Sequence, residues 1–140
     1  MHHSKLLLVV AALPLTLTAL GLSSLNQPTQ AQTPDRCPTG SGGGALVNLY
    51  RTRSFDVYIC QGGQGRQDWR ELDYYGVSRR SNNGLRLRAY LDSPGFYAVN
   101  GTYRYTIDPS KLTVTNDGKV LVQEPVETCL GNQSNCATSP

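Results

Sequence analysis

Hydrophobic and polar residues alternate along several short stretches of the chain. In residues 85–90, two leucines and an alanine alternate with two arginines and a tyrosine. Residues 55–60 and 102–107 show the same period of two. Successive side chains of a β-strand point to opposite faces of its sheet, so this pattern predicts half-buried strands.

Glycine, proline and asparagine separate these stretches at short intervals. From Gly84 onward the turn signals fall six to eleven residues apart, and the Asn-Gly pairs at 83–84 and 100–101 are typical of tight hairpins. No window shows a convincing helical period. We therefore predict an all-β fold, a meander of about six to seven short antiparallel strands arranged as a small barrel or a two-layer sandwich.

The beginning of the chain has a different pattern. Residues 6–22 are apolar apart from two threonines and Pro14, and they follow a short start that contains Lys5. Thr29 and Ala31 offer small residues at the positions that signal peptidase reads, so we predict a signal peptide over residues 1–31. The alternative is an uncleaved anchor, but the run is shorter than the roughly 20 apolar residues of a membrane-spanning helix.

The rest of the chain divides by composition into three parts. Residues 32–53 form a linker and arm rich in glycine and proline, residues 54–125 form the β-domain core, and residues 126–140 form a tail that depends on a disulfide for its order. Residues 45–50 fit either a first short strand or the end of the arm. Pro125 cannot donate a hydrogen bond to a neighbouring strand, so we expect it to end the sheet.

The cysteines form an even set in the part of the chain predicted to be exported: Cys37, Cys60, Cys129 and Cys136. An oxidising compartment lets disulfides persist, so two disulfides are expected. We favour Cys37 with Cys60, which pins the arm to a strand, and Cys129 with Cys136. The main alternative joins Cys60 to Cys129. A zinc site is disfavoured because the sequence has no Cys-x-x-Cys and no histidine remains after cleavage.

Positive charge is concentrated in one half of the exported chain. The whole sequence carries 13 Lys and Arg against 10 Asp and Glu, and loss of Lys5 leaves a formal charge of +2. Residues 51–104 hold nine arginines against five acids, whereas residues 105–140 hold two lysines against four acids. This distribution favours anionic groups on a cell-wall or polysaccharide partner, and an ordinary arginine-rich surface is the alternative.

The residues that remain after cleavage restrict catalysis. Both histidines lie at positions 2 and 3, so the exported chain cannot use a Ser-His-Asp or Cys-His mechanism and lacks the commonest metal ligand. A carboxylate-based glycosidase would draw on Asp56, Glu71 and Asp73, but their spacing singles out no pair. We therefore expect no enzymatic activity, no cofactor and no metal.

Arginine and tyrosine supply the strongest candidate for a binding surface. If the apolar residues of 85–90 point inward, the outward side chains form a stripe, which Arg104 joins from a nearby strand. The candidate residues are Arg86, Arg88, Tyr90 and Arg104. Such a face suits an anionic glycan through charge-assisted hydrogen bonds and ring contacts. The alternative is that the arginines lie flat over the tyrosines as packing.

Five segments carry a resemblance to known proteins: residues 57–60, 74–79, 85–89, 97–105 and 118–125. Together they resemble a group of small exported cyanobacterial β-domain proteins of unknown function. The resemblance implies a bacterial protein in a periplasmic or extracellular setting, and it carries no known activity.

Two shorter motifs resemble the membrane-bound lysozyme inhibitors of C-type lysozyme. Tyr58-Ile59-Cys60 and Asn100-Gly101-Thr102-Tyr103 lie roughly where that family has its cysteine-bearing strand and its Ser-Gly-x-x-Tyr loop. The chain departs from the family in having Asn100 in place of the serine and no Trp-x-Lys-Gly afterwards. The resemblance implies a small antiparallel barrel and a protein target.

Three functional hypotheses follow from the sequence. The first is a secreted or periplasmic, non-catalytic β-domain that binds an anionic glycan or cell-wall polymer. The second is a protein-binding inhibitor that uses the loop at Asn100 and Gly101, and the third is a carboxylate-based glycoside hydrolase. In each case we expect a monomer that binds no nucleic acid and, once the signal is cleaved, no membrane.

Overall fold

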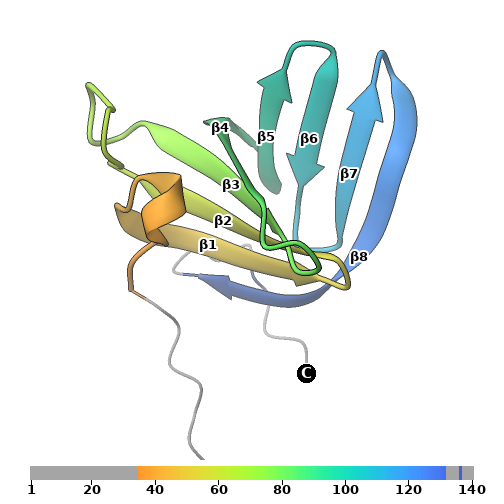
Figure 1. Cartoon of the computed structure of the whole chain (residues 1–140), viewed down its shortest axis with the longest axis horizontal. Coiled ribbons are helices and arrows are strands. Elements are labelled where there is room, and N and C mark those ends of the chain that lie inside the picture. The colour runs from red at the N-terminus through yellow and green to blue at the C-terminus, as the bar shows by residue number, and fades with distance from the viewer. Residues whose placement is uncertain (1–34, 132–135, 137–140) are drawn as a thin grey trace, which may run out of the picture. The chain divides into compact units, whose positions relative to one another are not determined.

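The computed structural model describes residues 35–131 and residue 136. The predicted signal peptide lies outside these residues. Within them the structure contains one short 3-10 helix, η1 (Thr39–Ser41), and eight β-strands. The strands, seen in Figure 1, are β1 (Ala45–Thr52), β2 (Phe55–Gln61), β3 (Leu72–Ser78), β4 (Gly84–Asp92), β5 (Gly95–Asn100), β6 (Tyr103–Ile107), β7 (Lys111–Asn116) and β8 (Lys119–Gly131). The described residues contain no helix long and apolar enough to cross a membrane.

The strands form a closed antiparallel barrel. Each strand pairs with the next along the chain, and β8 pairs with β1 to complete the circle. The predicted all-β fold is therefore confirmed, and the structure is a barrel rather than a sandwich. The strand additional to the predicted six or seven is β1, which the sequence left open between a strand and the end of the arm.

The alternation of side chains in the sequence becomes the inside and outside of this barrel. Across β5 to β8, Ala98, Tyr105, Val114 and Val122 stand opposite one another and face the interior. The register places the neighbouring position of each strand on the outer face, where Val99 and Val120 are exposed. Half-buried strands were predicted on this basis, and the burial patterns of β5 and β7 agree with the prediction.

β1 lacks the alternation because it is buried on both faces. Tyr50 lies in the barrel interior, while Leu46 and Leu49 belong to a second apolar cluster outside the barrel, beneath the amino-terminal arm. The disulfide between Cys37 and Cys60 holds the arm there, with a Cα–Cα distance of 6.0 Å. A strand covered on both sides does not show a period of two, and this explains the ambiguity of residues 45–50.

The favoured disulfide pairing is confirmed. Cys37 bonds to Cys60, and Cys129 bonds to Cys136 with a Cα–Cα distance of 5.3 Å. Two disulfides are compatible with an oxidising compartment such as the periplasm or the extracellular space.

The prediction that Pro125 ends the sheet is wrong. β8 continues to Gly131, and Pro125 lies where the strand changes partners: β8 pairs with β7 as far as Pro125 and with β1 from Val126 onward. A missing N–H is tolerated at such a change of partner, because it interrupts neither run of paired residues. The barrel therefore spans residues 45–131, which is wider than the predicted core of 54–125.

Candidate binding sites

The first predicted binding residue, Arg86, is engaged in an ion cluster around Asp73. Asp73 points out of the barrel from β3, yet its side chain is fully buried because the arm covers it. Nη2 of Arg86 donates to Oδ2 of Asp73 at 2.9 Å and to the carbonyl oxygen of Gln64 at 2.7 Å. Arg66 pairs with the other carboxylate oxygen, and its Nε donates to Oδ1 of Asp73 at 3.0 Å.

The charge of Asp73 is maintained by these partners. Burial alone raises the pKa of a carboxylate, but the hydrogen bonds from Arg66 and Arg86 outweigh it, so the pKa of Asp73 lies below its ordinary value. Asp73 is thus ionised at neutral pH and occupies both arginines. The Arg86 side chain is only 29% exposed, which gives it a packing role and separates it from the other predicted binding residues.

The glycine-rich arm lies directly on this cluster. A Cβ atom at Gly42 would lie 2.6 Å from Cζ of Arg86, and one at Gly63, in the β2–β3 loop, would lie 2.9 Å from Oδ2 of Asp73. Gly42 also has a φ of +86°, which side chains rarely adopt. The glycines therefore let the backbone approach the buried charges closely.

The other three predicted residues come together, and a fourth joins them. We call Arg88, Tyr90, Tyr97 and Arg104 the Arg–Tyr ladder. Tyr90 and Tyr97 are paired across β4 and β5, and their rings stack with centroids 5.2 Å apart. Cζ of Arg88 lies 5.8 Å from the Tyr90 ring centroid, and Cζ of Arg104 lies 3.9 Å from that of Tyr97. The ladder thus crosses β4, β5 and β6 on the outside of the barrel.

Tyr97 was not predicted as a binding residue, although the sequence carries a signal for it. Asp92 pairs with Gly95 around the turn at Ser93 and Pro94, so counting back equally from that turn places Tyr90 opposite Tyr97. Symmetry about a hairpin turn fixes cross-strand neighbours in this way.

Each arginine of the ladder also contacts an acid. Arg88 lies 3.2 Å from Glu71, and Arg104 lies 3.5 Å from Asp92. The two arginine side chains are 51% and 46% exposed. Exposed ion pairs of this kind contribute only about 0–1 kcal/mol each, so the guanidinium groups can exchange partners at small cost. Because the stacked rings cover one another, the ladder presents guanidinium N–H groups and tyrosine edges to solvent.

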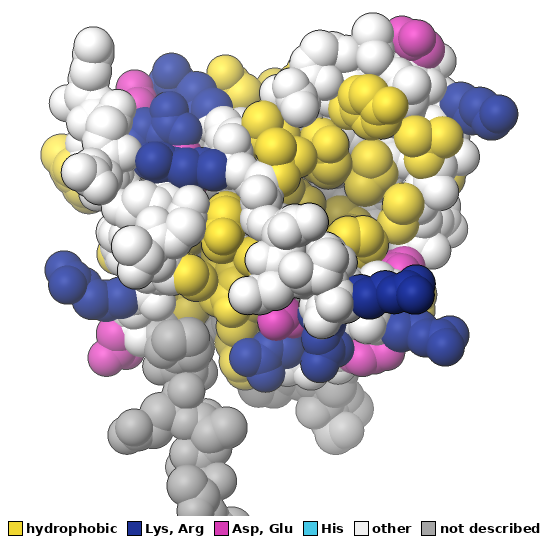
Figure 2. All heavy atoms as spheres, viewed as in Figure 1, with side chains coloured by type: hydrophobic (Ala, Val, Ile, Leu, Met, Phe, Trp, Pro, Cys, Tyr) yellow, Lys and Arg dark blue, Asp and Glu magenta, His cyan; other side chains and the backbone are white. Residues whose placement is uncertain are grey.

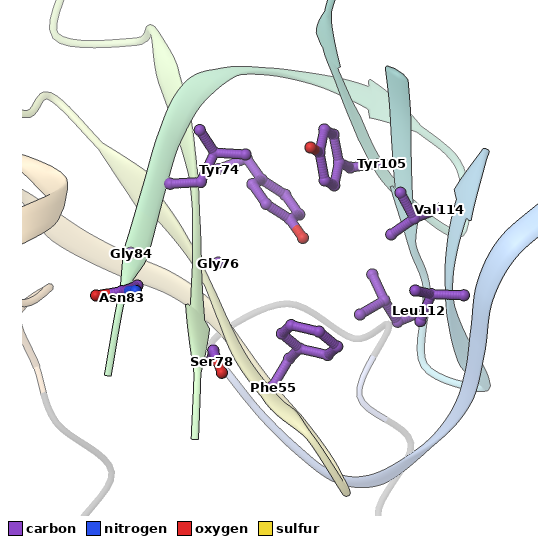
Figure 3. A pocket seen from close by; sticks show the side chains of 11 residues that line it. Phe55, Tyr74, Gly76, Ser78, Asn83, Gly84, Tyr105, Leu112 and Val114 are labelled. Atoms are coloured by element: carbon purple, nitrogen blue, oxygen red, sulfur yellow. The ribbon is translucent and has the colours of Figure 1, made fainter. Parts of the chain in front are cut away.

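A cavity in the barrel is the second candidate site. It has a volume of about 300 Å³ and lies between β3 and β4 on one side and β6 to β8 on the other (Figure 3). Its lining consists of Phe55, Tyr74, Gly76, Ser78, Asn83, Gly84, Leu85, Tyr105, Leu112, Val114 and Val122. None of these residues carries a charge. Figure 2 shows hydrophobic side chains gathered over β5 to β8, at the upper right of the same view as Figure 1.

The carboxylates considered for glycoside hydrolysis are each held by arginine. Glu71 contacts Arg88, Asp73 is enclosed by its two arginines, and Asp56 lies 3.8 Å from both Arg51 and Arg79. Among residues 35–131 and 136, no group of three or more His, Cys, Asp or Glu side chains could hold a metal ion. None of these three carboxylates lines the cavity.

The loop of the inhibitor hypothesis lies at the turn between β5 and β6. Oγ1 of Thr102 donates to Oδ1 of Asn116 at 2.6 Å, and the backbone N–H of Asp117 donates to the carbonyl oxygen of Thr102 at 3.2 Å. This loop and the β7–β8 turn therefore support each other at one end of the barrel.

Comparisons with protein-family models, with curated proteins and with solved structures found no significant match to this chain. The function is therefore inferred from the geometry of the two candidate sites.

Proposed function

We propose that the protein is an exported, non-catalytic binding domain and that its Arg–Tyr ladder binds a glycan carrying carboxylate or sulfate groups. One observation carries the proposal: three residues predicted from the strand pattern, Arg88, Tyr90 and Arg104, gather with Tyr97 in one exposed row across three strands. The predicted signal peptide and the two disulfides support export.

The ladder recognises an anionic sugar by exchanging carboxylates. An incoming carboxylate or sulfate takes the place of Glu71 beside Arg88 and of Asp92 beside Arg104, and it accepts charge-assisted hydrogen bonds from the guanidinium groups. The stacked tyrosines hold the two arginines in position, and their hydroxyl edges meet the sugar hydroxyls. A polymer that engages both arginines at once gains from multivalency, which compensates for the weakness of each contact.

Retention on an anionic polysaccharide such as alginate tests the proposal. Replacing Arg88 and Arg104 together by alanine is expected to abolish retention, and raising the salt concentration is expected to weaken retention of the wild-type protein. The control replaces Arg51 and Arg80, two exposed arginines on β1 and on the β3–β4 turn, and removes the same charge. Equal retention of both double variants would exclude the ladder as the site.

Replacing Arg88 and Arg104 by lysine separates charge from stacking. Lysine keeps the positive charge but loses the planar group that lies over the rings and donates two parallel hydrogen bonds. We expect the lysine variant to bind more weakly than wild type and more strongly than the alanine variant. Arg86 is unsuitable for this series because its removal leaves Asp73 buried without one of its partners.

A further inference from the structure

The barrel cavity is reachable from outside and closed at its inner end. Asn83 and Gly84, which lie at the start of β4, are exposed, whereas Tyr74 and Leu112 are buried. Eight-stranded barrels either fill their interior with side chains or leave room for one small ligand. A volume of about 300 Å³ is at the small end of the range for ligand pockets. The cavity therefore has the size of a single-ring or short-chain molecule.

One polar group inside the cavity has no partner. The Tyr74 residue as a whole is only 3% exposed, and its hydroxyl makes no hydrogen bond among the described residues. Figure 3 shows this hydroxyl pointing into the space enclosed by Phe55, Tyr105 and Leu112. Burial, with a smaller contribution from Tyr105, raises the pKa of Tyr74, so the group is a neutral donor at physiological pH. The hydroxyl oxygen is not among the fully buried atoms that lack a partner, so it keeps accessible surface toward the cavity, where a ligand can accept its hydrogen bond.

A glycine at an inward position of β3 leaves room for the Tyr74 ring. Gly76 follows Tyr74 on the same face of the strand, and a Cβ atom there would lie 2.9 Å from Cε1 and 3.1 Å from the hydroxyl oxygen of Tyr74. Glycine inside a strand is unfavourable unless something must approach its backbone closely. Here the absent side chain leaves the space that the tyrosine ring occupies beside the cavity.

From these features we propose that the cavity binds a small, uncharged and mainly apolar molecule whose oxygen accepts a hydrogen bond from Tyr74. The apolar lining from β6, β7 and β8 removes the body of the ligand from water, and the hydroxyl fixes its orientation. No cationic side chain lines the cavity, so a carboxylate would lose its hydration without a charged partner. This site is separate from the Arg–Tyr ladder and does not depend on the glycan proposal.

Three probes of nearly the same shape test the inference: acetophenone has a carbonyl acceptor, α-methylstyrene has none, and benzoate is charged. Titration of the ¹⁵N-labelled protein at pH 7 is expected to shift the amides of the cavity lining with acetophenone. A single hydrogen bond makes acetophenone bind about two- to tenfold more tightly than α-methylstyrene. Benzoate is expected to bind at least tenfold more weakly than acetophenone.

Two pairs of variants identify the site. Tyr74→Phe removes only the hydroxyl and is expected to abolish the preference for acetophenone over α-methylstyrene. Val122→Phe fills the cavity and is expected to abolish binding of both. Val120→Phe is the matched control, because Val120 is an exposed residue of the same strand.

The outcomes are distinct for each part of the proposal. Acetophenone that shifts no lining amide, or that binds Val122→Phe as well as Val120→Phe, overturns the cavity as a binding site. A preference that survives in Tyr74→Phe overturns the role of the hydroxyl. Preferred binding of benzoate overturns the assignment of an uncharged ligand. Thermal unfolding and the circular dichroism spectrum of each variant show that the barrel is intact.

Discussion

At the scale of single residues, the most constrained side chain is Asp73. Its carboxylate is buried outside the main core, beneath the arm, and holds two arginines from different parts of the chain. A buried ion pair contributes little beyond what a well-packed apolar group would supply, but removal of one partner leaves the others uncompensated. Removing Asp73 is therefore expected to lower the stability of the fold by much more than the ion cluster adds to it.

Replacing Asp73 by alanine is expected to lower the free energy of unfolding by about 3–5 kcal/mol, because Arg66 and Arg86 remain partly buried without their partner. Urea unfolding monitored by circular dichroism measures the change. The control is Asp92→Ala, which removes a half-exposed carboxylate and is expected to cost about 1 kcal/mol or less. Equal losses of unfolding free energy for the two variants would contradict the importance of the ion cluster around Asp73.

The same carboxylate predicts how stability varies with pH. Because the pKa of Asp73 is lower in the folded protein than in the unfolded chain, the unfolded chain takes up the proton first. The stability that ionised Asp73 contributes to the folded protein is complete above about pH 5. It is lost as the pH falls through the ordinary aspartate pKa of about 3.9 and below it. Unfolding free energies measured between pH 6 and pH 2.5 should fall less steeply for Asp73→Ala than for the wild-type protein.

Tyr50, in the barrel interior, carries a buried polar group that lacks a partner in the described part of the chain, whereas Asp73 has two. Its hydroxyl is buried with no hydrogen-bond partner among the described residues, and burial, aided by Asp108, raises its pKa to about 12. An unpaired buried hydroxyl costs stability, so Tyr50→Phe is expected to raise the free energy of unfolding by about 1 kcal/mol. Chemical denaturation of the two proteins at pH 7 checks this. A loss of more than about 1 kcal/mol would mean that the hydroxyl has a stabilising partner.

At the scale of elements, the sequence predicted the strands whose two faces differ. β4 and β6 have one face toward the core and one toward solvent, so their residues alternate and their positions were anticipated. β1 and β8 were harder to place for different reasons. β1 is covered on both faces, and β8 contains a proline at a position where no hydrogen bond to a neighbour is required.

The candidate sites were also predictable only where the two faces of a strand differ. Arg88, Tyr90 and Arg104 were predicted together because alternation alone fixes which side of a strand they occupy. The ion pair between Arg86 and Asp73 was not predictable, because it lies beneath an arm that folds back from elsewhere in the chain. The cavity could not be predicted from the sequence either. In the sequence, Tyr74, Gly76 and Val114 look like ordinary interior residues, and only the curvature of the barrel brings their strands opposite one another.

The arm is an element held by one covalent link. Replacing Cys37 and Cys60 together by alanine is expected to cost about 3 kcal/mol, and replacing Cys129 and Cys136 about 2 kcal/mol, because the first link closes the longer loop, with sequence separations of 23 and 7. Urea denaturation of both double variants measures the difference. Equal losses would indicate that the arm packs on the barrel without help from its disulfide.

At the scale of the whole molecule, the barrel formed by residues 45–131 leaves none of its own strand edges unpaired. Antiparallel sheets with free edges tend to associate through them, and closure removes that route. We expect the protein to be a monomer, and sedimentation velocity at increasing concentration checks this expectation. Val99 is exposed beside the polar Asn100, whereas Val120 and its neighbour Leu121 are exposed together.

Ending the chain after Pro125 opens the barrel. Without residues 126–131, β1 loses its partner on one side and presents free N–H and C=O groups. We expect the shortened protein to aggregate or to pair edge to edge, as seen by light scattering, whereas the full-length protein stays monomeric. A shortened protein that remains a soluble monomer with an unchanged circular dichroism spectrum would contradict the importance of closure.

The seam between β1 and β8 also determines when the barrel can form. Every other pair of neighbouring strands is consecutive in the chain and can assemble once its second strand is synthesised, whereas Asn48 pairs with Gly131, near the end of the described residues. A growing chain therefore carries an incomplete sheet with two open edges for most of its synthesis, and the slowest contact is the last to become available. For the export that we propose, we expect the chain to be translocated before this last strand pairs, because the barrel cannot close without residues 126–131.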